Sequence, residues 1–142
     1  KRDGYNLGQF AVLLLDCRND SDRAITHYTE ALRILPKEVN FYIGRGKAYG
    51  GKADFERALQ DYNQAIRLNP RDADTYFQRG VLWWQQEDFD KAIADLTESL
   101  RIDNKFVQAY INRGRAFYAE PDRLGEYILI DYVQQKRRRI HA

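Results

Sequence analysis

The chain has 142 residues, of which 44% are hydrophobic, and its 23 basic and 21 acidic residues nearly balance. That balance argues against nucleic acid or an anionic membrane as the partner, because no long-range field selects a polyanion. One cysteine and two histidines give neither an internal disulfide nor a zinc-type spacing, and no apolar run in the sequence is long enough to span a bilayer.

The chain repeats one pattern with a period of 34 residues. An aspartate recurs in step at four positions: Asp20, Asp54, Asp88 and Asp122. A fixed period of this size indicates stacked supersecondary units, each of which buries its second face against a neighbour. Counting from Tyr5 divides a single domain, residues 1–142, into four units at 5–38, 39–72, 73–106 and 107–142, the last of which is divergent.

The spacing of apolar residues in each unit predicts two helices in succession, and it does so most clearly in the second unit. Residues 39–49 place Tyr42, Gly46 and Tyr49 on one helical face. A second apolar stripe at helical spacing follows: Ala58, Leu59, Tyr62, Ala65 and Ile66. A glycine inside a helix costs about 1 kcal/mol against alanine, so its repetition predicts the close approach of another backbone. The repeated glycines are Gly46, Gly80 and Gly114.

The repeated aspartate stands just before each second helix. Its carboxylate can accept hydrogen bonds from the first free N–H groups of that helix. We therefore predict that all four aspartates are N-caps and have no ligand role.

A small residue in the first helix, an aromatic residue one turn later and an alanine-rich second helix closed by proline resemble the tetratricopeptide repeat (TPR). The matching residues are Gly46, Gly80, Gly114, Tyr49, Trp83, Phe117, Ala58, Ala92, Ala65, Pro36 and Pro70. The resemblance covers nearly the full chain. It implies an all-α fold, an α-solenoid in which about four helix-turn-helix units form a right-handed superhelix with a concave groove lined mainly by the first helices.

The resemblance also implies a non-catalytic scaffold or adaptor that binds a peptide or helical segment of a partner protein in this groove. Groove-facing positions of the family, carried over to this sequence, give the candidate partner-binding residues Asn40, Ile43, Lys47, Phe77, Gln78, Val81, Trp84, Gln108, Ile111, Asn112, Arg115 and Tyr118. Exposed aromatic residues beside an arginine often carry binding energy. A structural alternative stays open for two of them: Trp84 packs against the next helix, and Phe77 closes the seam between repeats.

TPR proteins that hold the acidic C-terminal tails of heat-shock chaperones use a carboxylate clamp of lysine, asparagine and arginine side chains. In the two possible registers, the corresponding residues are Gln9, Leu13, Gly44, Asp74 and Gln78, or Ile43, Lys47, Gln78, Gln108 and Asn112. Neither set reproduces the clamp. A chaperone-tail adaptor is therefore not expected.

Arginine fills the seventh position of the last three units: Arg45, Arg79 and Arg113. The twenty-third position is Asp61 or Asp95 in the middle two units. An arginine among packed helices needs a carboxylate to offset its desolvation, so we predict ion pairs. Two pairings fit the sequence: Arg45 with Asp61 and Arg79 with Asp95 within units, or Arg79 with Asp61 and Arg113 with Asp95 between units.

The last helix, from Arg123 to Val133, is apolar on more than one side. We expect it to be buried under a further repeat, a C-terminal segment or a second chain. The alternative function is accordingly a structural or oligomerisation element, part of a longer solenoid or self-associating. The absence of methionine, with Lys1 first, also suggests a piece of a longer protein.

The remaining sequence contains no motif typical of a catalytic or cofactor-binding site. It has no glycine-rich phosphate loop and no nucleophile beside a histidine, so we expect no enzyme, no cofactor and no metal. The basic run Lys136–Arg139 is interpreted as charge that the helix dipole favours at a helix C-terminus. RNA binding is disfavoured by the near-neutral charge of the chain. With no signal-peptide pattern at the start, we expect a cytoplasmic protein with a protein or peptide partner.

Overall fold

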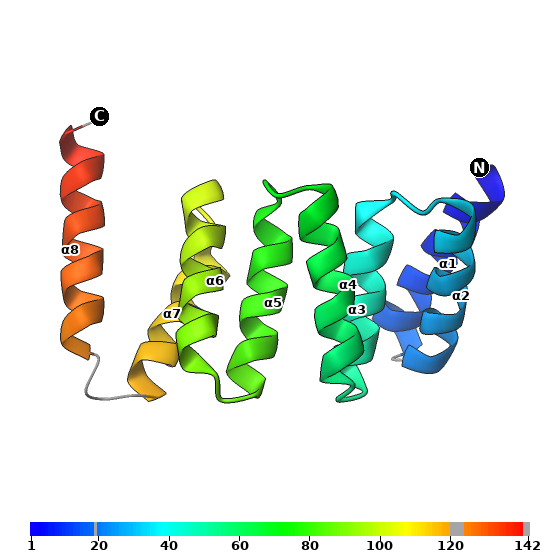
Figure 1. Cartoon of the computed structure of the whole chain (residues 1–142), viewed down its shortest axis with the longest axis horizontal. Coiled ribbons are helices and arrows are strands. Elements are labelled where there is room, and N and C mark those ends of the chain that lie inside the picture. The colour runs from blue at the N-terminus through cyan, green and yellow to red at the C-terminus, as the bar shows by residue number, and fades with distance from the viewer. Residues whose placement is uncertain (19, 120–123, 141–142) are drawn as a thin grey trace.

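The computed structural model describes residues 1–18, 20–119 and 124–140, and within these ranges it contains helices and turns but no strand. The helices are α1 (Arg2–Arg18), α2 (Ser21–Ile34), α3 (Val39–Gly51), α4 (Phe55–Leu68), α5 (Ala73–Gln85), α6 (Phe89–Ile102), α7 (Val107–Ala119) and α8 (Leu124–Ile140). Successive helices run up and down as hairpins that follow one another along the long axis of the molecule (Figure 1). The expected all-α solenoid of about four helix-turn-helix units is confirmed.

Aspartates begin the second helices of the first three hairpins. Asp20, Asp54 and Asp88 each accept a hydrogen bond from the backbone N–H three residues later. The predicted N-caps are thus confirmed at these positions, whereas Asp122 lies outside the described residues. Asp72, which the repeat pattern does not single out, caps α5 in the same way through the N–H of Thr75.

Two of the repeated glycines lie where a second helix approaches closely. A β-carbon on Gly46 would lie 2.7 Å from Cε1 of Tyr62, and one on Gly80 would lie 2.9 Å from Cγ of Leu96. At Gly80 the backbone carbonyl oxygen of Ala92 also lies 3.3 Å away, as expected, whereas at Gly46 the expectation of a close backbone needs correction, because the nearest atoms all belong to the Tyr62 side chain. At Gly114 the expectation is wrong for the described residues, none of which an added β-carbon would meet within 4 Å.

The hydrophobic core couples each hairpin to the first helix of the next one. One buried cluster joins α1 and α2 to α3 through Phe41, and a second joins α3 and α4 to α5 through Leu82. A third joins α6 to α7, with Leu96, Leu100 and Ala109 at its centre. Stability in such a solenoid therefore depends on adjacent interfaces rather than on one central core.

Two buried ion pairs connect the helices within the middle hairpins. Arg45 donates to both carboxylate oxygens of Asp61 at 2.9 and 2.8 Å, and Arg79 donates to Asp95 at 2.7 and 2.8 Å. Of the two pairings that the sequence allows, the structure shows the one within units. The hydrogen bond to Asp61 also raises the pKa of the Arg45 guanidinium.

The same arginines connect neighbouring hairpins. Arg45 donates to Thr29 Oγ1 at 3.2 Å and Arg79 to Asn63 Oδ1 at 2.8 Å, in each case on the second helix of the preceding hairpin. Each guanidinium also lies over the tyrosine ring three residues earlier in the chain, with 5.9 Å from Arg45 to the Tyr42 centroid. One repeated arginine thereby ties three helices together.

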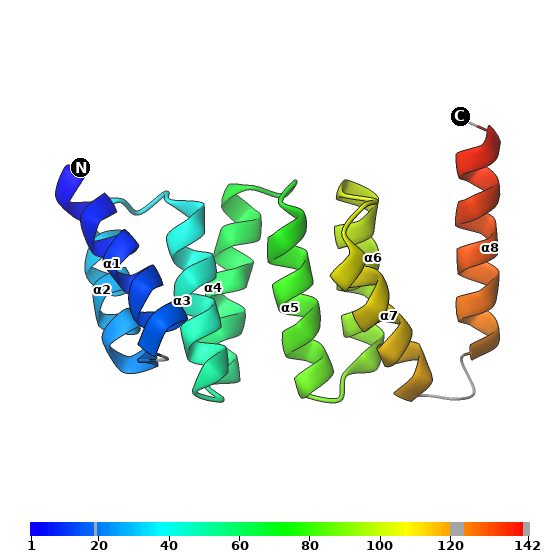
Figure 2. The same ribbon diagram turned by 180° about the vertical axis from the view of Figure 1, so that it is seen from behind.

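The last hairpin differs from the others. Helix α8 stands apart from α7 in both views of the molecule (Figures 1 and 2). Several of its apolar side chains are exposed, Leu129 to 62%. Nothing in the described part of the single chain covers these side chains, so burial under a further repeat, a C-terminal segment or a second chain stays a prediction.

Candidate functional site: a groove along the first helices

Three adjoining pockets lie along the side of the solenoid formed by α1, α3, α5 and α7. The first, between α1 and α3, is lined by residues that include Val12, Asp16, Asn40, Ile43, Lys47 and Asp74. The second, between α3 and α5, shares Lys47 with it, and the third, between α5 and α7, shares Val81 and Gln85 with the second. Neighbouring pockets share lining residues and therefore adjoin, and we call this row of three pockets the groove.

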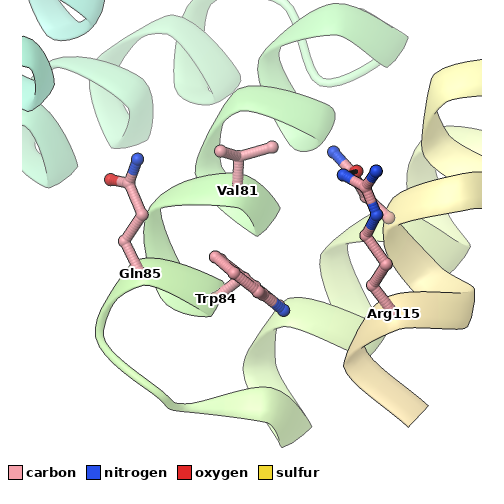
Figure 3. Close-up of a pocket in the computed structure, with 5 residues that line it drawn as sticks. Val81, Trp84, Gln85 and Arg115 are labelled. Atoms are coloured by element: carbon pink, nitrogen blue, oxygen red, sulfur yellow. Dashed lines mark hydrogen bonds between the residues drawn. The ribbon is translucent and has the colours of Figure 1, made fainter. Parts of the chain in front are cut away.

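The pocket between α5 and α7 combines an apolar wall with polar groups. Val81, Trp84 and Gln85 project from α5, and Arg115 projects from α7 on the other side of the opening (Figure 3). Trp84 is 43% exposed, so its side chain is not buried against the next helix. Arg115 also donates to Asn112 Oδ1 at 3.5 Å. This arrangement can hold an apolar side chain against the indole while the guanidinium and amide groups bind backbone or side-chain acceptors.

The pocket between α5 and α7 has a volume of about 140 Å³. Sites for drug-sized molecules typically enclose about 300–1,000 Å³. A single side chain of a longer ligand fits this pocket better than a small metabolite does.

The middle of the groove carries a polar cluster from two first helices. Lys47 Nζ lies 3.5 Å from Asp74 Oδ2, and Gln78 donates to the other oxygen of Asp74 at 3.0 Å. Both partners of the ion pair are substantially exposed, so it contributes little to stability. Its groups remain accessible to exchange partners with a bound chain.

Two tyrosines from second helices reach the floor of the groove. Tyr28 of α2 lies against Gly44, and Tyr62 of α4 lies against Gly46, because neither glycine has a side chain to block the ring. Burial, with a smaller effect of the Asp16 carboxylate, raises the pKa of Tyr28 to about 12. Burial also raises the pKa of Tyr62, so both phenols are neutral at physiological pH.

The sequence pattern does not assign these two tyrosines to the groove, because their periodicity places them in the core stripe of the second helix. The glycines at positions 44 and 46 are the signal that could have identified them. A glycine on the inner face of a first helix leaves room for a buried ring of a second helix to lie directly against it.

The structure brings together most of the residues that the sequence pattern proposes for partner binding. Those that line the groove are Asn40, Ile43, Lys47, Gln78, Val81, Trp84, Asn112 and Arg115. Ile43 is largely buried and contributes only a small part of the wall.

The remaining proposed residues lie elsewhere. The ring of Phe77 lies 4.7 Å from that of Phe106 and packs against the core cluster of α6 and α7, as in the structural alternative for this residue. Gln108, Ile111 and Tyr118 are exposed on α7, outside the pockets described above.

Comparison with known families agrees with the helical hairpins and their repeat length. A family model described as tetratricopeptide repeat matches residues 43–105, which run from within α3 to just beyond α6. Residues 43–105 thus match the tetratricopeptide repeat family, and the described helices have the hairpin arrangement of that repeat. A search of curated protein sequences finds no match to the chain.

Solved TPR structures share the fold at low sequence identity. The first TPR of Spaghetti (RPAP3) bound to the HSP90 peptide SRMEEVD is 21% identical with a TM-score of 0.79, covering 83% of this chain and 93% of that one. MamA is 20% identical with a TM-score of 0.81, covering 96% of this chain and 80% of that one. The TPR2B domain of yeast Sti1, in a pHsp70 complex, is 17% identical with a TM-score of 0.80, covering 84% and 100%. These likenesses establish the fold.

Two other kinds of site are not found in the described structure. Among residues 1–18, 20–119 and 124–140, no helix combines the length and apolar character needed to cross a membrane. The same ranges contain no group of three or more histidine, cysteine, aspartate or glutamate side chains placed to hold a metal ion.

Proposed function

We propose that this TPR domain is a non-catalytic interaction scaffold whose groove binds an extended or helical segment of a partner protein. The observation that carries the proposal is the row of adjoining pockets from α1 to α7, which ends at the half-exposed indole of Trp84 beside Arg115. Tryptophan and arginine are among the residue types most enriched in side chains that dominate binding energy. Trp84 and Arg115 therefore provide the anchor, and the polar cluster around Asp74 orients the bound chain.

The partner differs in chemistry from the chaperone peptides held by the Spaghetti and Sti1 domains. The clamp positions of the first register hold no lysine or arginine here, and one of them is the carboxylate of Asp74. Asp74 is already paired with Lys47, the one lysine among the positions of the second register. A peptide ending in several carboxylates would meet this charge without a compensating set of cations, so we expect no tight binding of such a tail.

A library of displayed random peptides tests the proposal without requiring that the natural partner be identified. Peptides selected on the wild-type chain are expected to bind Trp84→Ala and Arg115→Gln at least about tenfold more weakly, a loss of about 1.4 kcal/mol. Val107→Ala is the matched control, because Val107 is exposed on α7 outside the groove pockets. Equal binding to all four proteins, or failure to select any peptide, would contradict the proposal.

A further inference from the structure

Helix α8 carries an apolar face that nothing covers in the described structure. Ile128, Leu129, Tyr132 and Ile140 are each at least 61% exposed, and Val133 is 40% exposed. At about 100° per residue, Leu129, Val133 and Ile140 fall within a narrow arc, with Tyr132 and Ile128 beside it. These five residues therefore form a stripe on one side of the helix, and Lys136 and Arg139 lie on the same side between Val133 and Ile140.

The stripe points away from the rest of the molecule. Toward α7, the helix presents Gln134, which accepts a hydrogen bond from Arg113, and Arg138, whose guanidinium lies 5.7 Å from the Tyr110 ring centroid. A pocket between α6 and α8 is lined on the α8 side by Gln134, Arg137 and Arg138. Helix α8 thus turns polar residues inward and apolar residues outward, the reverse of an ordinary terminal helix.

The pattern of the stripe is self-complementary. Gly125, Leu129, Tyr132 and Lys136 follow one another at spacings of four, three and four residues, the spacing of a helix-pairing seam. An antiparallel pair of such helices with its axis between residues 132 and 133 aligns the following residues across the seam: Gly125 with Ile140, Leu129 with Lys136, and Tyr132 with Val133. A β-carbon on Gly125 would meet nothing within 4 Å, which leaves space for an isoleucine side chain.

We propose that a second copy of this chain covers the stripe, through antiparallel pairing of the two α8 helices about a two-fold axis. A two-fold interface uses the same patch on both copies, which requires a self-complementary pattern of this kind. The proposal is independent of peptide binding, because the groove lies along α1 to α7 and shares no lining residue with the stripe.

The charges of α8 favour the antiparallel orientation. The last turn of the helix contains Arg137, Arg138 and Arg139. A parallel pair would place the two basic runs side by side, whereas the antiparallel register above separates the two Arg138 residues by 11 positions along the helices, about 17 Å. That separation exceeds the Debye length of about 8 Å at physiological ionic strength, so their repulsion is largely screened.

The exposed area fits a weak dimer. A large aromatic side chain such as Tyr132 buries about 150–250 Å² when fully covered, so the stripe amounts to a few hundred Å² per copy. Standard interfaces bury about 800 Å² per partner, which places this contact at the lower end of stable association. We therefore expect a weak dimer whose population depends on protein concentration.

Sedimentation equilibrium over a range of concentrations tests the pairing. The wild-type chain is expected to approach twice the monomer mass, and Leu129→Glu is expected to stay monomeric at the highest concentration used. Val107→Glu is the matched control, because it places the same charge at an equally exposed residue of α7. A wild-type chain that is monomeric throughout, or a dimer that survives Leu129→Glu, would overturn the proposal.

Disulfide trapping tests the orientation directly. In a Cys17→Ser background, which removes the only cysteine, the double variant Leu129→Cys/Lys136→Cys is expected to form a covalent dimer on mild oxidation. The two sites lie about 10 Å apart within one helix, too far for a bond inside a single chain. Leu129→Cys alone is expected to remain unlinked. Trapping by Leu129→Cys alone, or none by the double variant, would rule out the antiparallel arrangement.

Discussion

The hairpins α5/α6 and α7/α8 begin with similar first helices and end with different packing. In α5/α6, Leu96 closes over Gly80, and Arg79 reaches Asp95, which lies 16 residues later in the chain. In α7/α8, the space beside Gly114 is open to at least 4 Å, and Arg113 donates at 3.5 Å to Gln134, which lies 21 residues later. Closure of a hairpin in this protein therefore depends on residues of the second helix, since the first helices keep both glycine and arginine.

The residue aligned with Asp61 and Asp95 in the fourth unit is Leu129. In the two middle hairpins, this aspartate fixes the second helix to the first one through two hydrogen bonds from one guanidinium. A leucine cannot accept those hydrogen bonds. The residue at this position therefore does not hold α8 against α7 as Asp61 and Asp95 hold the second helices of the middle hairpins.

The turns of the second and third hairpins share a backbone conformation that excludes proline. Ala53 and Glu87, at the same position of the second and third units, both have positive φ angles, 59° and 58°. A proline cannot take this conformation, because its ring holds φ near −65°. In the sequence, that position of the fourth unit is Pro121, which lies outside the described residues. A proline is therefore incompatible with the turn conformation of the second and third hairpins.

The largest expected effect comes from removing the carboxylate of Asp95, which joins the two helices of the third hairpin through Arg79. Asp95→Ala leaves the Arg79 guanidinium without its buried partner, and breaking a buried pair in this way costs about 3–5 kcal/mol. Urea unfolding measures the free energy. Asp131→Ala, which removes a carboxylate of α8 that accepts a hydrogen bond from Gln135 of the same helix, is expected to stay within about 0.5 kcal/mol of wild type. Equal losses in the two variants would contradict the contrast between the hairpins.

The next effect concerns the packed tyrosine of the first hairpin. Tyr28 has a pKa of about 12 in the folded chain, mainly because it is buried, against about 10 when unfolded. The unfolded chain therefore loses this proton first, and the free energy of unfolding falls as pH rises from about 10 to 12, by about 2–3 kcal/mol in total. Below pH 10 the contribution is fully present.

Unfolding of Tyr28→Phe as a function of pH isolates this contribution. The variant is expected to lose less stability than wild type across the alkaline range, whereas Tyr132→Phe, on the exposed stripe of α8, is expected to follow the wild-type curve. Parallel curves for wild type and Tyr28→Phe would show that the buried phenol is not what limits alkaline stability.

The 34-residue period was sufficient to predict the helices, the aspartate caps of the first three hairpins and the pairing of arginine with aspartate, but it left open whether the pairs form within or between units. The groove positions came from the resemblance to the TPR family, and most of them line the groove. Phe77 was assigned to the groove but packs against Phe106, because a side chain at the edge of the groove can turn into the seam. Which neighbour it contacts depends on the spacing between hairpins, which the period does not encode.

The contacts of the last hairpin could not be predicted from the period. Gly114 keeps step with Gly46 and Gly80, so the pattern predicts the same close approach, yet the residues that would fill the space belong to a helix with a different register. The apolar character of α8 was visible in the sequence, but the side to which it turns was not. That orientation follows from the polar contacts of Gln134 and Arg138 with α7.

Substitution of equivalent glycines gives the smallest expected effect and the most direct test of the contrast, because the two hairpins should respond with opposite signs. In Gly80→Ala, the new methyl group lies 2.9 Å from Leu96 Cγ and 3.3 Å from the Ala92 carbonyl oxygen, so α6 must shift, at a cost of about 1–3 kcal/mol. In Gly114→Ala, the methyl group meets nothing within 4 Å, and the better helix former is expected to stabilise the chain by up to about 1 kcal/mol. Thermal and urea unfolding measure both. If Gly114→Ala destabilises the chain as Gly80→Ala does, α8 closes over α7 in solution as α6 closes over α5, and the apolar stripe would no longer be free to pair.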